Sequence, residues 1–224
     1  MTGARGERNR LAIQRPAVVS AVPRIEAPAE EDLAGLRADE QVPIAVQEIL
    51  TQLHRKDPYL VAHSVATGVL AASIAHVMGL GAAAGFAAGI VGAVHEVAAL
   101  VTDTASEAEM LTMAEGEWIL ERARFRNATL EVLDRISPLR PYGEIAAQLY
   151  SDMLISPIAR IVAVADCYDW FVAAGDGRRA PLSAVKALDY LQAHAGVRYS
   201  PEAVEALRDL CTGVYRGEDE PGLA

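Results

Sequence analysis

The chain of 224 residues has few cysteines and few aromatic residues. Its two cysteines, Cys167 and Cys211, make neither a disulfide framework nor a cysteine-based zinc motif, which favours a reducing, cytoplasmic setting. Aromatic residues amount to 5%, whereas alanine is abundant. This composition argues against a β-sandwich, whose strands favour aromatic and β-branched side chains, and favours closely packed helices.

An excess of basic residues is also lacking, because 20 basic residues face 30 acidic ones and give a net charge of −10. A DNA- or RNA-binding protein needs a basic surface, so nucleic-acid binding is not expected. Apolar residues make up 52% of the chain, which is enough for a hydrophobic core and excludes global disorder.

No apolar segment of the kind found in secretory signals follows the N-terminus. Residues 77–94 form a stretch of 18 residues without an acid, lysine or arginine, which is long enough for a membrane span. The stretch contains five glycines, however, and His95 and Glu96 follow at once. We therefore expect a buried helix of a soluble bundle and no membrane span.

The chain divides by composition into three parts. Residues 1–40 are predicted to be a flexible leader or linker, because three prolines interrupt a segment whose first part is basic and whose second part is acidic. Residues 41–216 are predicted to be one helical domain, and residues 217–224 a tail. The expected helices cover approximately 42–53, 58–78, 82–101, 114–124, 127–136, 142–153, 157–174, 182–195 and 201–215. The predicted fold class is an all-α bundle of seven to nine helices.

Polar residues inside apolar helices are the best candidates for a functional site. His95 and Glu96 place an imidazole beside a carboxylate, and a buried carboxylate is costly unless it is paired or bound to a metal. Asp166 ends the apolar run 161–165 within another expected helix, and His63 precedes His95 by one helix. Two histidines and two carboxylates suit a divalent iron, manganese or zinc ion. The alternative is that these residues are satisfied core residues and that no metal is bound.

The order His63, then His95 with Glu96, then Asp166 resembles the H…HD…D pattern of the HD superfamily of metal-dependent phosphohydrolases. Residues 40–215 resemble more specifically the HD-GYP family, whose members hydrolyse cyclic di-GMP at a centre of two or three metal ions. The segments that carry the resemblance are 57–64, 88–96, 111–115, 159–169 and 201–204. The closest is 159–169, which is similar to the family's A-R-I-x-x-V-A-D-x-Y-D helix.

Several positions depart from the family pattern. The departures are Glu96 in place of aspartate, Ala98-Ala99 in place of glycine and lysine, Tyr59 in place of a glutamate ligand, the missing G-Y-P loop, and the absence of any histidine between His95 and His194. The ligands that remain are His63, His95, Glu96 and Asp166, which would hold at most one metal ion. Clamping of a phosphoester between two metals is then not expected.

The resemblance and its departures together imply a degenerate HD-GYP-like signalling domain. We expect it to be non-catalytic and to bind a protein partner or a nucleotide such as cyclic di-GMP. The alternative is a single-metal HD phosphohydrolase that acts on a nucleotide or another phosphoester, with cyclic di-GMP hydrolysis the less favoured reaction. No individual residue is assigned a catalytic role.

Four further residues are predicted to shape the site. Arg122 or Arg160 would replace the missing lysine as a phosphate ligand, because a guanidinium group pairs well with phosphate. The alternatives are a solvated helix face for Arg122 and a salt bridge on the helix surface for Arg160. Trp170 and Phe171 would fill the space left by the lost loop. The alanine- and glycine-rich helices permit close helix approach, which fits either a homodimer or an intramolecular core.

Overall fold

The computed structural model describes residues 25, 28, 36, 39–103, 115–151, 154, 156–173 and 180–213. These residues form eight α-helices and no strand, so the predicted all-α class and helix number are confirmed. The α-helices are α2 (Gln41–Lys56), α3 (Pro58–Val77), α4 (Gly81–Val94), α6 (Glu115–Asp134), α7 (Arg140–Ala147), α8 (Pro157–Val172), α9 (Ala184–Ala193) and α10 (Pro201–Thr212). The short 3-10 helices are η1 (His95–Leu100), η2 (Ser137–Leu139) and η3 (Gln148–Tyr150).

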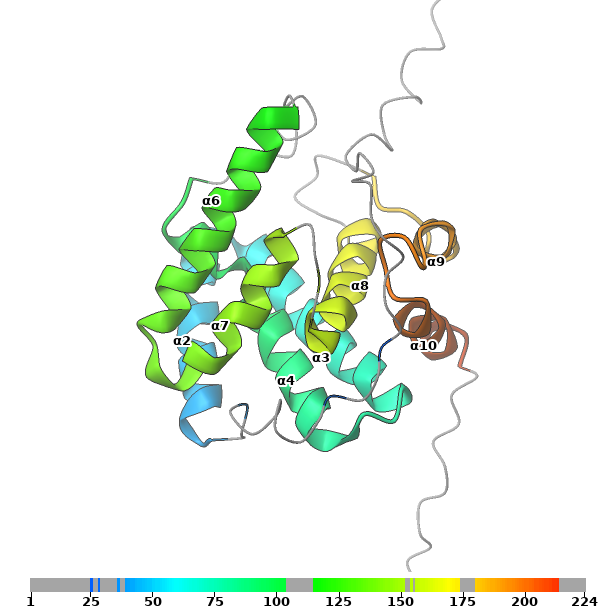
Figure 1. Ribbon diagram of the computed structural model, residues 1–224, viewed down its shortest axis with the longest axis horizontal. Coiled ribbons are helices and arrows are strands. Elements are labelled where there is room, and N and C mark those ends of the chain that lie inside the picture. Colours follow the sequence, from blue (N-terminus) through cyan, green and yellow to red (C-terminus); the bar gives the residue numbers. More distant parts are fainter. Residues whose placement is uncertain are drawn as a thin grey trace, which may run out of the picture.

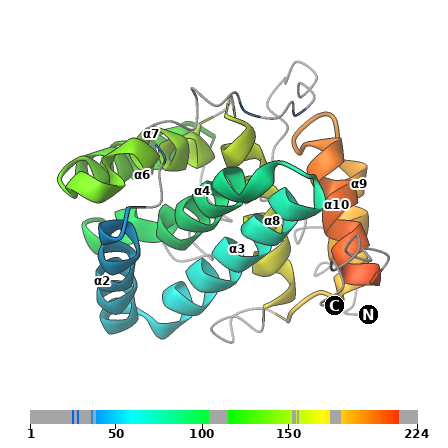
Figure 2. The same ribbon diagram turned by 90° about the horizontal axis from the view of Figure 1, so that it is seen from below.

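Helices α3, α4 and α8 pack against one another at the centre of the molecule (Figure 1). Helices α2, α6 and α7 lie on one side of this centre, and α9 and α10 lie on the other side in both ribbon views (Figures 1 and 2). The core contains fully buried aliphatic side chains from each of the three central helices, such as Ile74, Val91 and Ile161.

The helical hairpin α3–α4 follows the signals in the sequence. Asp57 caps α3 by accepting a hydrogen bond of 2.8 Å from the backbone N–H of Tyr59, and Pro58 occupies the first turn. Gly79 and Gly81 adopt the left-handed φ values of +70° and +82° that the tight turn between the helices requires.

The two helices of this hairpin approach closely enough for backbone contact. A Cβ atom placed on Gly92 would lie 2.7 Å from the Cα atom of Gly68. Only glycine fits at such a contact, so the small residues of α3 and α4 serve close packing within the chain.

The prediction of one continuous helix over 82–101 is correct only as far as Val94. The α-helix ends at Val94, whose φ of −113° and ψ of 0° leave the helical region, and η1 continues from His95. The hydroxyl group of Tyr150 donates a hydrogen bond of 2.8 Å to the carbonyl oxygen of His95, which gives this turn a tertiary partner. Hydrophobic periodicity does not reveal such a partner, because it reports only which face of a helix is apolar.

Two other boundaries also differ from expectation. The separate helices over 114–124 and 127–136 are one helix, α6, since no proline or glycine lies between them. The expected helix over 142–153 ends earlier, because α7 stops at Ala147 and η3 follows it.

Little of the predicted leader belongs to the described part of the chain. Ile25 and Leu36 are buried in the hydrophobic core. The rest of 1–38, apart from Pro28, lies outside the described residues, as do residues 217–224 of the predicted tail.

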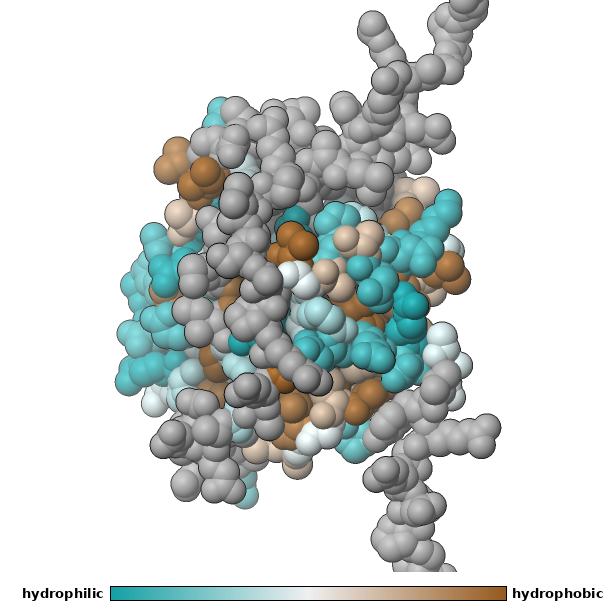
Figure 3. Space-filling view, turned by 45° about the vertical axis from the view of Figure 1, so that its right-hand side comes forward, coloured by the Kyte–Doolittle hydropathy of each residue, from teal (hydrophilic) through white to brown (hydrophobic). Residues whose placement is uncertain are grey.

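Two helical segments, Pro58–Val77 and Gly81–Leu100, are long and apolar enough to cross a membrane, each with a mean hydropathy of 1.6. The second segment is 67% buried inside the protein, as is usual for the core helix of a soluble protein, and the first is 39% buried. On the face shown in Figure 3, hydrophilic and hydrophobic residues are intermixed. The described residues therefore show no clear membrane span.

Candidate metal centre

The three central helices bring His63, His95 and Asp166 together. His63 comes from α3, His95 from the first position of η1 directly after α4, and Asp166 from α8. The Oδ1 atom of Asp166 lies 3.0 Å from Nε2 of His63 and 3.5 Å from Nε2 of His95. One possible ligand atom from each residue lies within 4.8 Å of the others. The cluster therefore has the composition and the spacing to hold a metal ion.

Glu96, the fourth predicted ligand, lies at the edge of this cluster. Its Oε1 atom is 3.4 Å from Nε2 of His95 and 4.0 Å from Nε2 of His63. All four predicted ligands thus share one site, but only three of them form the compact group.

The two imidazole rings present the same nitrogen to the site. His95 Nδ1 lies 2.7 Å from the carbonyl oxygen of Gly92, so this nitrogen carries the proton that the carbonyl accepts. His63 Nδ1 lies 2.7 Å from Oδ2 of Asp169. Both Nε2 atoms then face Asp166. The Nε2 atom of His95 is buried and makes no hydrogen bond within the described residues, and the nearest carboxylate oxygens, of Glu96 and Asp166, lie 3.4 and 3.5 Å away.

Burial differs between the histidines and the acids. The side chains of His63 and His95 are 3% and 2% exposed, whereas those of Asp166 and Glu96 are 36% and 21% exposed. The imidazoles therefore lie in the buried part of the site, and the carboxylates lie nearer to solvent.

The charges of the cluster compensate one another in the metal-free protein. Burial lowers the pKa of His63, but hydrogen bonds with Asp166 and Asp169 outweigh this effect and raise the pKa to about 9. Burial likewise opposes the charged form of His95, yet Asp166 and Glu96 hold its pKa well above the usual value. Hydrogen bonds to the histidines keep the pKa of Asp166 low, although burial acts in the opposite direction. A metal ion would replace the imidazole protons as the positive charge.

The separations between ligand atoms fit a first-row divalent ion. Bonds of about 2.1 Å to a tetrahedral ion place ligand atoms about 3.4 Å apart. The two distances from Asp166, 3.0 and 3.5 Å, lie on either side of this value. Two imidazoles and a carboxylate suit iron, manganese or zinc. The donor set therefore fits one such ion and identifies no single metal.

Sequence reasoning did not assign roles to two residues of the site. Asp169 follows Asp166 by three positions on α8, and residues with this spacing share one helix face, which is the signal that points to it. Tyr150 donates to the carbonyl oxygen of His95, and its ring lies 5.5 Å from that of Phe125. Burial, followed by the charges of Glu96 and Asp166, raises the pKa of Tyr150 well above its usual value, so its hydroxyl stays a donor.

The predicted phosphate ligands have contacts within the protein. Arg122 donates a hydrogen bond of 2.6 Å to the carbonyl oxygen of Ser151. Arg160 is buried on α8, where burial lowers its pKa and the negative charge of Glu202 opposes this effect. A role of either arginine toward phosphate stays a prediction.

Trp170 and Phe171 pack as neighbours near the end of α8. Their ring centroids lie 5.2 Å apart, and the ring of Phe171 lies 4.8 Å from that of Tyr190 on α9. Phe171 is buried in the core between these two helices. Whether these side chains replace the family's loop stays a prediction.

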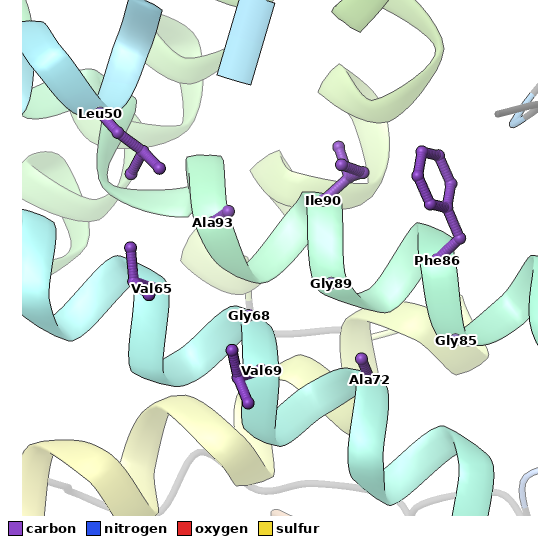
Figure 4. Close-up of a pocket in the computed structure, with 10 residues that line it drawn as sticks. All are labelled: Leu50, Val65, Gly68, Val69, Ala72, Gly85, Phe86, Gly89, Ile90 and Ala93. Atoms are coloured by element: carbon purple, nitrogen blue, oxygen red, sulfur yellow. The ribbon is translucent and has the colours of Figure 1, made fainter. Parts of the chain in front are cut away.

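A separate apolar groove of about 380 Å³ runs between α3 and α4 (Figure 4). It is lined by Leu50, Val65, Gly68, Val69, Ala72, Gly85, Phe86, Gly89, Ile90 and Ala93. None of the four predicted metal ligands lines this groove, so it is distinct from the metal centre.

No protein-family model matches the chain, and no curated protein sequence matches it. The resemblance to the HD-GYP family therefore rests on the residues of the sequence itself.

Proposed function

We propose that this chain is an HD-type helical domain that holds a single divalent metal ion at His63, His95 and Asp166. We further propose that it acts in signalling as a degenerate HD-GYP-like domain, by binding a protein partner or a cyclic dinucleotide. It would not act as a cyclic di-GMP phosphodiesterase.

One observation carries the metal proposal. The Nε2 atom of His95 is buried, makes no hydrogen bond to any residue that the structure describes, and lies 3.5 Å from a carboxylate oxygen of Asp166. The carboxylates of Glu96 and Asp166 approach this buried nitrogen only to 3.4 and 3.5 Å, and a bound metal ion would satisfy the nitrogen and the carboxylates together. His63 Nε2 faces the same carboxylate oxygen, so the ligand atoms converge on one point.

The non-catalytic signalling role is supported by the absence, in the sequence, of further metal-binding histidines and of the family's lysine. No histidine lies between His95 and His194, where the family supplies ligands for further metals. Ala98 and Ala99 occupy the positions of the family's glycine and lysine, and both are buried. These residues offer no cation to a phosphate group.

The second candidate function is a single-metal phosphohydrolase. It is supported by the exposure of Asp166, whose side chain is 36% accessible, because solvent and a small substrate can then reach the ligand group. His63, His95 and Asp166 would hold the ion, and the ion would supply a water molecule of lowered pKa for attack on a phosphoester. The chain's own contribution would be to hold and orient the ligands from three rigid helices.

The test is the metal content of the purified protein. We expect about one iron, manganese or zinc ion per chain, because three converging ligands support a single ion. The ion should be lost in His95→Ala and in the nearly isosteric Asp166→Asn, and it should remain in His54→Ala, which removes an exposed histidine of α2. Far-ultraviolet circular dichroism would confirm that each variant is folded. Wild-type protein without metal, after purification and incubation with each ion, would refute the site.

Turnover assays separate the two candidate functions. Rapid hydrolysis of cyclic di-GMP with added manganese or iron would refute the non-catalytic role. Metal-dependent hydrolysis of p-nitrophenyl phosphate that disappears in His95→Ala would favour the phosphohydrolase. Binding of cyclic di-GMP without turnover would support the signalling role.

A further inference from the structure

We propose that Asp169 is a positioning residue that sets the orientation of the His63 ring and so directs Nε2 of His63 into the ligand group. The importance of this orientation for metal affinity rests on the function proposed above. The contact itself does not depend on it, because it is present within the protein alone.

The contact is short and enclosed. The Oδ2 atom of Asp169 lies 2.7 Å from Nδ1 of His63, and the two side chains are 15% and 3% exposed. An ionised carboxylate only accepts hydrogen bonds, so Nδ1 of His63 must carry the proton. In a neutral imidazole the lone pair then lies on Nε2, which is the nitrogen that faces Asp166 at 3.0 Å.

Packing alone does not determine which edge of the His63 ring faces the ligand group. The ring of Tyr59 stacks on His63 with a centroid distance of 6.0 Å and an angle of 8° between the planes. The ring of His95 meets it edge-on at 5.1 Å and 71°. These contacts fix the plane of the His63 ring, but a rotation by half a turn would preserve the plane and exchange the two edges. The hydrogen bond to Asp169 distinguishes the two orientations.

The two histidines obtain this orientation from different acceptors. His95 Nδ1 faces a neutral backbone carbonyl, that of Gly92, whereas His63 Nδ1 faces a charged carboxylate. A charged acceptor binds the proton more strongly and makes the imidazole a more basic ligand. Only the acceptor of His63 can be removed by substitution of a side chain.

The experiment combines two measurements on Asp169→Ala, Asp169→Asn and a control, Asp189→Asn. The control removes an exposed negative charge from α9 and leaves the contact intact. Long-range ¹H–¹⁵N spectra of histidine-labelled, metal-free protein report the Nδ1 proton of His63, assigned by its absence in His63→Gln. Competition titrations report the affinity for zinc and cobalt.

We expect the protected Nδ1 proton of His63 in the wild type and in Asp189→Asn, and its loss in Asp169→Ala. Removal of a group that orients a metal ligand typically lowers metal affinity by about 10- to 100-fold, and we expect this loss in Asp169→Ala. Asp169→Asn should lose less, because an amide oxygen still accepts from Nδ1. This partial rescue would not be expected if the carboxylate merely supported the fold.

An unchanged Nδ1 proton signal of His63 in Asp169→Ala would overturn the positioning role. If the wild type binds metal, an equal metal affinity of Asp169→Ala and the wild type would overturn it as well. If the wild type bound no metal while its Nδ1 proton disappeared in Asp169→Ala, the proposed function would fail and the positioning of His63 by Asp169 would stand.

Discussion

Substitution of Gly92 by alanine tests whether the close approach of α3 and α4 builds the metal centre. A Cβ atom at Gly92 would lie 2.7 Å from Cα and 2.8 Å from N of Gly68, and 3.0 Å from the carbonyl carbon of Thr67. All three atoms belong to the backbone, so the clash cannot be relieved by a change of rotamer. Helix α3 must move away from α4.

A matched control lies one turn earlier on the same helix. A Cβ atom at Gly89 would meet the Cβ of Ala72 at 3.6 Å and the carbonyl oxygen of Gly68 at 3.7 Å, which are ordinary contacts. The position borders the apolar groove, where a methyl group has room. Both substitutions gain about the same helix propensity, about 1 kcal/mol. Their comparison therefore isolates the steric effect.

Overpacking against rigid neighbours costs about 1–3 kcal/mol. We expect the free energies of unfolding of Gly92→Ala and Gly89→Ala to differ by this amount, with Gly92→Ala the less stable protein. Urea denaturation of the metal-free proteins, followed by circular dichroism, measures the difference. Metal affinity should also fall in Gly92→Ala alone, because the carbonyl of Gly92 orients His95 and α3 carries His63. Equal stability of the two variants would refute the helix contact as described.

Two further predictions concern the site. Tyr150→Phe removes the hydroxyl that donates to the carbonyl of His95, and should lower the free energy of unfolding by about 1 kcal/mol in urea titrations; no loss would contradict a stabilising contact. Metal affinity should rise with pH, because the proton held by His63, with its pKa of about 9, must leave before the metal binds. His95, whose pKa is also raised, must lose a proton as well, so zinc competition titrations should show at least about tenfold tighter binding at pH 8 than at pH 7. Equal affinities at the two pH values would contradict the assignment of the two histidines as ligands.

The expected helix over 58–78 and the expected helix start at 82 agree with α3 and with the start of α4 to within one residue. Asp57 and Pro58 mark the start of α3, and Gly79 and Gly81 mark the turn into α4, because caps and left-handed glycines act through neighbouring residues only. The break at Val94 could not be predicted in this way. It coincides with a tertiary contact, because the carbonyl oxygen of the next residue, His95, accepts a hydrogen bond from Tyr150, 55 positions further along the chain.

The candidate ligands could be identified for a different reason. Polar residues within apolar helices are conspicuous, and His63, His95 and Asp166 come together in the structure as expected. The role of Asp169 was not evident, because the residue lies near the end of a helix and its partner is 106 positions earlier in the chain. Sequence reasoning thus finds a site more readily than it finds the residues that orient the site.

The arrangement of the three central helices explains why the site and the core belong together. Glycine contacts hold α3 against α4 and place His63 beside His95. Helix α8 packs against both and supplies Asp166 and Asp169 from one face, so that each nitrogen of the His63 ring meets one carboxylate. A change that separates α3 from α4 should therefore weaken metal binding and stability together, whereas Asp169→Asn should affect mainly metal binding. This difference between the two classes of variant follows from the geometry, because one class moves helices and the other changes a single hydrogen bond.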